Sequence, residues 1–257
     1  MSKKIFLIAD FFYRDFTGGA ELNDFSLVER FTHRGYEIVE VYCKDVTIKF
    51  LQDHINEKFI VGNFVTLDLD CMKYMINNIT YVIYEHDHKY LMKRNPISYR
   101  NFIAPASELA NVEFYECAKS TICLTELAKN VFMLNTGLEN VLKVGASVWR
   151  DQDLDYILSL RGGVKSERYA IMDSDNPIKK RHKCIEYCEK NGIKYDLISD
   201  RSHQNFLQKL SKYKGLIFMT GHLETCCRLV VEAKMLDCDV ITTTKLIGAA
   251  SEDWFEL

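Results

Sequence analysis

The sequence has few of the residues that interrupt regular structure, with only 3 Pro and 12 Gly among 257 residues. Its 9 Cys include no C-x-x-C pair, which argues against a disulfide framework and favours reduced core thiols in a cytoplasmic protein. No G-x-G-x-x-G motif is present, so a nicotinamide-dependent dehydrogenase is disfavoured. The first apolar run, Ile5 to Ala9, ends at Asp10 and is too short for a signal peptide or a membrane span.

Charge and composition indicate an ordinary globular protein. The net charge of −3 gives no general basic footprint for nucleic acid, although a local basic patch stays compatible with it. A chain of this length can form one large domain or two smaller ones. The bias toward Lys, Asn, Ile, Phe and Tyr suggests an AT-rich genome. The reduced cysteines and the short first apolar run predict a cytoplasmic location, and the genome bias suggests a bacterium or a phage-infected host.

The stretch from Gly215 to Thr243 predicts a strand, a helix and a second strand. Gly215 to Thr220 is a short apolar run, typical of a buried strand. Thr225 can cap a helix, and Asp239 to Thr243 is a β-branched run that favours a parallel strand. Two carboxylates, Glu224 and Glu232, have seven residues between them. Glu224 is expected at the carboxyl end of a strand, where open α/β sheets bind ligands.

The spacing E-x7-E followed by Ala, from Glu224 to Ala233, resembles the donor-site signature of retaining glycosyltransferases with two Rossmann-like domains (GT-B, family 4-like). The resemblance implies that Glu232 binds the ribose hydroxyls of a nucleotide, and that Glu224 faces the transferred sugar and its phosphates. Two solvated helix carboxylates would give the same spacing. Glu232, however, falls in an apolar row, which is an unusual place for a solvated charge.

The first half carries a second motif of this family. The strand Lys4 to Asp10 is followed by Gly18-Gly19-Ala20-Glu21 and a helix that ends near Gly35. Glycines at such a turn let a ligand approach the backbone, and a helix N-terminus favours an anion, although a plain tight turn is the alternative. G-G-x-E after the first strand is similar to the N-terminal half of the family. Further strands are expected at Glu37 to Tyr42, Phe59 to Val61, Phe64 to Leu67, Thr80 to Tyr84, Ser120 to Leu124 and Asn140 to Val144, with helices at Asn111 to Lys119, Glu126 to Leu134 and Asp151 to Leu160.

Four titratable groups in a row, Glu85-His86-Asp87-His88, follow the strand that ends at Tyr84. They are suited to bind acceptor hydroxyls or to act as a general base. An exposed charged turn is the equal alternative. A metal site at His86 and His88 is disfavoured because no third ligand is evident.

The second half alternates strands and helices, which predicts a doubly wound parallel sheet. Strands are expected at Arg168 to Met172 and Lys194 to Ser199, and helices at Ile178 to Lys190 and Gln204 to Leu210. The flexible composition of residues 161–166 places the domain boundary there, giving an acceptor-side domain at 1–160 and a donor domain at 161–257. The predicted fold is α/β, with two Rossmann-like domains facing a cleft and a minimal C-terminal half.

The loop before the 178–190 helix resembles the family's N-P-x-K-G phosphate loop. Asn176, Pro177 and Lys179 match this pattern, whereas Lys180 replaces the glycine. The family's preceding arginine has no counterpart, because Asp173 and Asp175 occupy that region. Cys226-Cys227-Arg228 is a further departure from the family pattern, in which Arg228 could pair with Glu232 or reach a phosphate.

These patterns together predict an enzyme that transfers a sugar from a nucleotide-sugar, a UDP-sugar, to a hydroxyl acceptor, with retention and without a metal or other cofactor. Asp68-Leu69-Asp70 has the letters of a metal motif but is expected to be a surface loop. One alternative is a phage-type DNA glycosyltransferase for hydroxymethylated bases, with Lys89, Lys93, Arg94 and Arg100 on phosphates. Another is a non-catalytic nucleotide or nucleotide-sugar binder. The candidate catalytic residues are His86, Asp87, His88 and Glu224, and the candidate donor-binding residues are Gly18, Gly19, Lys179, Glu224, Thr225, Arg228 and Glu232.

Overall fold

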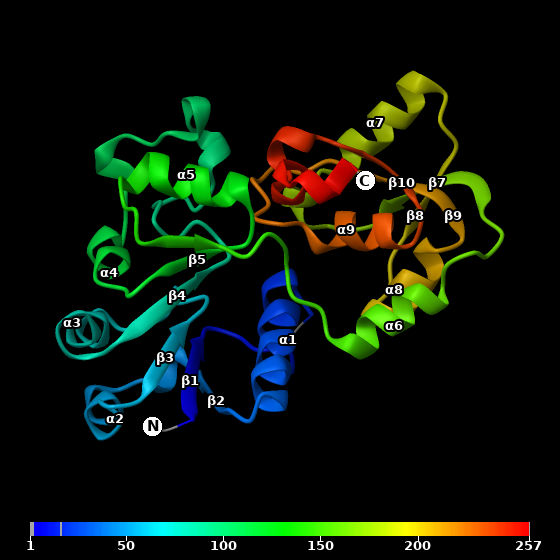
Figure 1. The fold of residues 1–257 in the computed structure, drawn as a ribbon. Coiled ribbons are helices and arrows are strands. Elements are labelled where there is room, and N and C mark those ends of the chain that lie inside the picture. The colour runs from blue at the N-terminus through cyan, green and yellow to red at the C-terminus, as the bar shows by residue number, and fades with distance from the viewer. Residues whose placement is uncertain (1–2, 16, 257) are drawn as a thin grey trace. The chain divides into compact units, whose positions relative to one another are not determined.

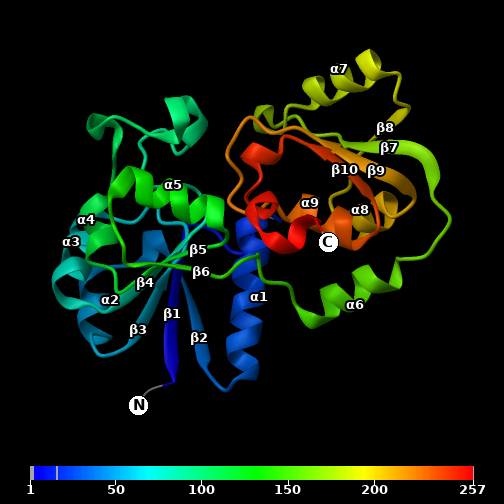
Figure 2. The same ribbon diagram turned by 45° about the horizontal axis from the view of Figure 1, so that its top comes forward.

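Both halves of the chain alternate strands with helices, and each half builds a parallel sheet. The computed structural model describes residues 3–15 and 17–256. The chain divides into two compact units, residues 1–149 and 150–257. Figures 1 and 2 show the ribbon of each unit, with helices on both faces of its sheet. This is the predicted α/β class with two Rossmann-like units.

The first unit contains a six-stranded sheet in the order β2-β1-β3-β4-β5-β6, with every pairing parallel. Residues 5–9 of β1 are almost completely buried, as expected for a strand covered on both faces. Helix α1 lies on one face, and α2 and α3 lie on the other (Figure 1). The strands are β1 (Lys4–Ala9), β2 (Glu37–Tyr42), β3 (Lys58–Val61), β4 (Tyr81–Glu85), β5 (Thr121–Cys123) and β6 (Val141–Lys143). The helices are α1 (Gly19–His33), α2 (Ile48–Asp53), α3 (Leu69–Asn78), α4 (Val112–Glu116) and α5 (Glu126–Thr136).

The second unit contains a four-stranded parallel sheet in the order β10-β9-β7-β8. Its core includes Ile171, Ile217, Cys184 and Cys188, so the two cysteines one helical turn apart are packing residues. All 9 Cys are free and only Cys117 is exposed, which confirms the prediction of core thiols. The strands are β7 (Ser166–Met172), β8 (Tyr195–Ile198), β9 (Tyr213–Phe218) and β10 (Asp239–Thr242), and the helices are α6 (Asp151–Ser159), α7 (Arg181–Asn191), α8 (His203–Leu210) and α9 (Arg228–Met235).

Two local predictions in the first unit were wrong. Residues 64–67 form a turn and not a strand, because the Asp10 carboxylate accepts hydrogen bonds from the amides of Val65 and Thr66 and from the Thr66 hydroxyl. Asp68 does not lie in a surface loop: it is the N-cap of α3 and accepts from the amides of Asp70 and Cys71.

The helix expected to start after Thr225 begins three residues later, at Arg228. Its N-cap, Cys227, has φ 68°, a left-handed conformation that turns the chain immediately before the helix. The helix expected from residue 178 is likewise divided: Pro177–Lys179 forms a 3₁₀ turn, and α7 starts at Arg181. In both places the loop between strand and helix is longer than predicted.

Composition placed the domain boundary at residues 161–166, but the boundary between the two compact units falls between Trp149 and Arg150. Helix α6, which we assigned to the first domain, falls in the second unit and packs against α9. None of the helices in the described parts of the chain has the length and apolarity needed to cross a membrane.

Candidate active site

The strand order of the second unit creates a point where consecutive loops diverge. From β7 the chain crosses to β8 on one side, whereas β9, the other neighbour of β7, leads to β10 on the opposite side. Such a switch point opens a crevice outside the carboxyl ends of the strands, where α/β sheets bind ligands. The loop after β7 carries Lys179 and the loop after β9 carries Glu224. The fold therefore brings together two predicted site residues that are 45 positions apart.

Lys179 and Glu224 form an ion pair at this switch point. The Lys179 Nζ lies 3.2 Å from Glu224 Oε1, and the Thr220 hydroxyl lies 3.3 Å from the same oxygen. The amide of Gly221 donates to the carbonyl of Ile178 at 2.7 Å and joins the two loops. Burial lowers the pKa of Lys179, but the Glu224 carboxylate more than offsets it, so the pKa is raised. Lys179 is thus a cation at neutral pH.

Lys180 stands where the resembling family has a glycine, and its backbone keeps the conformation that glycine adopts freely. Its φ is 46°, in the left-handed region that costs a side-chain-bearing residue energy. Its side chain runs over Gly221, where an added Cβ would lie 2.3 Å from Lys180 Cε. Lys180 therefore adopts a glycine-like backbone conformation, and its side chain adds a second basic group to the loop that carries Lys179.

Glu232 is buried in a charged cluster and is not a solvated helix carboxylate. Its side chain is 3% exposed, with Oε2 3.0 Å from His203 Nε2 and Oε1 3.5 Å from Arg228 Nε. Of the two alternatives stated for Arg228, the structure shows the contact with Glu232. Thr225, the residue after Glu224, is buried, but the N-cap of α9 is Cys227. His203, the first residue of α8, lies 29 positions before Glu232, and no local pattern predicts that the two residues pair.

The aspartates that replace the family's arginine have a basic partner in the structure. Arg181, the first residue of α7, contacts the carboxylate of Asp173 and lies 3.3 Å from Asp175 Oδ1. This pairing fixes the loop after β7 to the start of the following helix. Arg181 was not singled out from the sequence, since its partners lie in a loop whose course only the fold defines.

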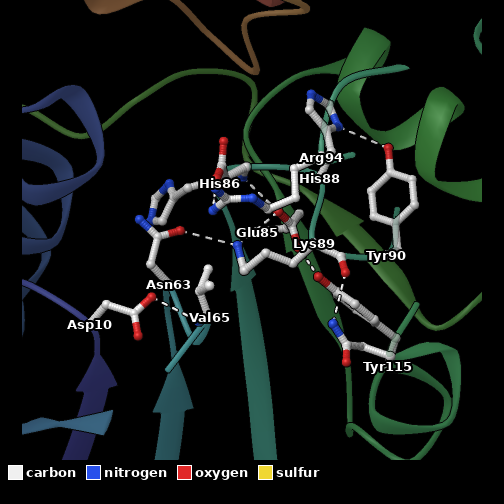
Figure 3. Close-up of polar contacts among 12 residues, drawn as sticks. Asp10, Asn63, Val65, Glu85, His86, His88, Lys89, Tyr90, Arg94 and Tyr115 are labelled. Atoms are coloured by element: carbon white, nitrogen blue, oxygen red, sulfur yellow. Dashed lines mark hydrogen bonds and ion pairs between the residues drawn. The ribbon is translucent and has the colours of Figure 1, made fainter. Parts of the chain in front are cut away.

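In the first unit, a buried ion pair stands at the end of β4 (Figure 3). Glu85 is 2% exposed, and its Oε1 accepts from Lys89 Nζ at 3.0 Å and from the amide of Asp87 at 2.7 Å. Its other oxygen accepts from the Tyr115 hydroxyl. Lys89 also donates to Asn63 Oδ1 at 3.1 Å. Burial alone would raise the pKa of Glu85, but Lys89 and the hydrogen bonds lower it to about 2.

The neighbouring histidines are buried, so the segment is not an exposed charged turn. His86 Nε2 lies 2.8 Å from Asp24 Oδ1, and both side chains are 3% exposed. His88 has φ 52° and its Nδ1 lies 2.9 Å from the Tyr90 hydroxyl. Asp87 differs, since its carboxylate is 37% exposed and lies 2.8 Å from Arg94 Nη1. Of the three predicted catalytic residues here, Asp87 has the most accessible side chain.

In the predicted glycine pair, Gly18 has no left-handed backbone and Gly19 has no steric requirement for glycine. Gly18 is the N-cap of α1 with extended backbone, and a Cβ on Gly19 would meet nothing within 4 Å. A closer approach occurs at Gly62, at the end of β3, where an added Cβ would lie 3.1 Å from Asp24 Oδ2. The first sheet also has a switch point, because β2 and β3 lie on opposite sides of β1. Asp24 and Glu21, both buried on α1, form an acidic pair there. Burial raises the pKa of Glu21, and the nearby Asp24 carboxylate raises it further.

Three of the four cations considered for phosphate contacts already face carboxylates. Lys89 is buried against Glu85, Lys93 lies 3.6 Å from Glu108, and Arg94 pairs with Asp87. Arg100 is exposed. Across residues 3–15 and 17–256, no group of three or more His, Cys, Asp or Glu side chains is arranged to hold a metal ion.

Comparison with known proteins identifies the fold. No family model and no curated protein sequence matches the chain. Among solved structures, an alpha-glucosyltransferase in complex with UDP and a 13-mer DNA containing an HMU base is similar over 96% of this chain and 81% of its own, with a TM-score of 0.58 and 10% identity. Anabaena Alr3699/HepE in complex with UDP and glucose is similar over 93% and 80%, with a TM-score of 0.58 and 13% identity. These likenesses show a fold shared with glycosyltransferases of the two-Rossmann class.

Proposed function

We propose that this chain is a glycosyltransferase that moves a sugar from a UDP-sugar to a hydroxyl acceptor. The observation that carries the proposal is the meeting of Lys179 and Glu224 at the switch point of the second sheet. The shared fold with the alpha-glucosyltransferase and with HepE, whose structures contain UDP, supports a nucleotide-sugar as donor. E-x7-E spacing supports the same donor.

Lys179 is proposed to stabilise the leaving diphosphate. As the bond between the anomeric carbon and the diphosphate oxygen breaks, negative charge develops on that oxygen, and a prepositioned ammonium stabilises it. The ion pair with Glu224 keeps Lys179 charged and oriented before the donor arrives. Glu224 is then released toward the sugar. A cation supplied by the protein replaces the role of a divalent metal, and we therefore propose metal-independent transfer.

Glu232 is proposed to accept hydrogen bonds from the ribose hydroxyls, with Arg228 and His203 holding its carboxylate in place. These contacts are made before and during the reaction, so they contribute mainly to binding. No covalent nucleophile is assigned, and the proposed stereochemical outcome is retention, which follows from the family resemblance. Retention in a single displacement requires the acceptor oxygen to attack the anomeric carbon on the face from which the diphosphate leaves.

On the acceptor side, Asp87 is proposed to take the proton as the acceptor oxygen attacks the anomeric carbon. It is the accessible carboxylate at the end of β4, and its amide is fixed by Glu85. General-base assistance of this kind contributes roughly 10²–10⁴-fold in rate. His86, paired with Asp24, and His88, paired with Tyr90, are proposed to shape the loop that presents Asp87.

DNA is the second candidate acceptor, favoured by the DNA in the alpha-glucosyltransferase structures. DNA binding through Lys93, Arg94 and Arg100 would fall steeply with salt, because each phosphate contact releases counterions. If the protein does not bind a hydroxymethylated duplex even at low salt, DNA is excluded as the acceptor. UDP binding without any product, for every acceptor tested, would instead indicate a non-catalytic nucleotide binder.

The proposal is tested by titrating UDP into the protein and three variants in a calorimeter. Lys179→Met should weaken binding about 10- to 100-fold, since a charge-assisted hydrogen bond contributes about 1.5–3 kcal/mol. Lys190→Met, at the exposed end of α7, is the matched control and should bind UDP normally. Glu232→Gln should also weaken UDP binding, because the ribose hydroxyls lose a charged acceptor. Gln is preferred to Ala because its amide oxygen can still accept a hydrogen bond from the buried Arg228. Equal UDP affinity in Lys179→Met and Lys190→Met would refute the donor site.

A further inference from the structure

A small pocket opens on the first unit beside the loop that carries Asp87. Its volume is about 220 Å³, and it lies between the turn after β3, the start of α3 and the segment after β4. An engineered apolar cavity of about 150 Å³ binds benzene, so this pocket has room for one six-membered ring. The residues that matter most for its chemistry are Val65, Leu69, Met72, Leu91, Met92 and Arg94.

The rim of this pocket holds apolar side chains whose exposure to water is unfavourable. Val65 is 55% exposed, Leu69 is 68% exposed and Met92 is 65% exposed, and all three line the pocket. The floor is also apolar, because Phe64, Met72 and Leu91 are buried there. Clustered exposed apolar residues around a concavity are typical of a binding site, whereas single ones are not.

The backbone around the pocket is held by polar contacts. Asp10 accepts hydrogen bonds from the amide of Val65 (Figure 3) and from the amide and hydroxyl of Thr66. On the opposite wall Asn111 donates to the Lys89 carbonyl at 2.9 Å. Arg94 and Asn111 have φ of 47° and 55°, conformations that persist only where the surroundings impose them. The backbone that carries the pocket residues is therefore held by defined contacts.

Arg94 connects the pocket to the proposed reacting group. It lines the pocket, and its guanidinium lies 2.8 Å from the Asp87 carboxylate. A ring seated on Leu69, Met72 and Met92 can direct a substituent toward this pair. The remaining polar groups of the lining are Lys89, which already donates to Glu85 and Asn63, and Asn111.

We propose that this pocket is an acceptor subsite for a ring alcohol with an apolar body, of the phenol class, whose hydroxyl points to Asp87. The inference rests on the proposed glycosyltransferase function and adds the chemical class of the acceptor. A sugar ring is disfavoured against Val65, Leu69 and Met92, because these side chains cannot pair with its several hydroxyls. A DNA phosphate also fits poorly, since the cations at the pocket face carboxylates.

The test compares two ring compounds of similar size as probes, p-cresol and myo-inositol, by calorimetry on the full chain. p-Cresol should bind more tightly than myo-inositol. Met92→Glu places a charge at the rim and should weaken p-cresol binding about 10-fold or more, the loss expected for an apolar contact replaced by a carboxylate. Met92→Leu keeps the apolar surface and should bind as the unmodified protein does. Leu134→Glu, at an equally exposed Leu on α5, is the matched control and should have no effect.

UDP titrations on the same proteins separate this inference from the proposed function. The acceptor inference alone is overturned if UDP binds normally and any one of three results is found. These are a preference for myo-inositol, no binding of p-cresol, or equal binding of p-cresol by Met92→Glu and Leu134→Glu. Absence of UDP binding by the unmodified protein overturns the proposed function. Transfer of sugar to p-cresol, with KM raised by Met92→Glu and not by Leu134→Glu, supports both.

Discussion

Replacing Lys89 by Met should destabilise the first unit by about 3 kcal/mol at neutral pH. Removing one partner of a buried ion pair generally costs about 3–5 kcal/mol. The pKa of Glu85 is lowered to about 2 in the folded chain, because Lys89 and the hydrogen bonds to Glu85 together outweigh burial. Both side chains are 2% exposed, so solvent screens this pair little.

The pH dependence gives this prediction a sign. With Lys89 present, the folded pKa of Glu85 is lowered, so its stabilisation is complete above pH 4.5 and is lost as pH falls toward about 2. Without Lys89, the largest contribution that lowers the pKa of Glu85 is lost, so this pKa rises and ionisation of Glu85 stabilises the folded chain less. The difference between the two proteins should therefore be largest near neutral pH and should shrink in acid.

Hydrogen exchange of the β4 and β5 amides measures the opening free energy of the first unit alone. The double variant Glu85→Gln/Lys89→Met should be more stable than Lys89→Met, because a neutral amide replaces an uncompensated charge while keeping partners for the Tyr115 hydroxyl and the Asp87 amide. Lys73→Met removes a Lys from an exposed ion pair and is the control, with an expected change near zero. If Lys89→Met were as stable as Lys73→Met at pH 7, the reasoning would be refuted.

Three further predictions concern packing, capping and metal. Gly215→Ala should cost about 1–3 kcal/mol by overpacking, because the new Cβ would lie 2.5 Å from the Asp239 carbonyl oxygen, whereas Gly163→Ala, with nothing within 4 Å, should be neutral in thermal unfolding. Asp68→Ala should lower stability by about 1 kcal/mol through loss of the α3 N-cap, with unchanged transfer rates; a large loss of transfer would instead assign Asp68 to the reaction. Transfer should also persist in excess EDTA, and its restoration only by manganese or magnesium would contradict the role proposed for Lys179.

The sequence by itself determined the order of most strands and helices. Parallel strands covered on both faces are continuous apolar runs, as at residues 5–9 and 215–218, and this pattern is local. Alternation of such runs with helices then implies two parallel sheets. Prediction failed where a distant group decided the backbone: Phe64 to Leu67 has the composition of a strand, but Asp10 provides hydrogen bonds that hold it as a turn.

Only the tertiary structure decided which charged groups meet and which are buried. His86 lies 62 positions from Asp24, and Lys179 lies 45 positions from Glu224, so each pair depends on which strands are neighbours in its sheet. Burial then changes the chemistry of the same residue types. It makes Glu85 part of an internal ion pair and leaves Asp87, two residues later, as the accessible carboxylate. The sequence placed these residues at a strand end, but their separate roles follow from the solvent and partners that the folded chain gives each of them.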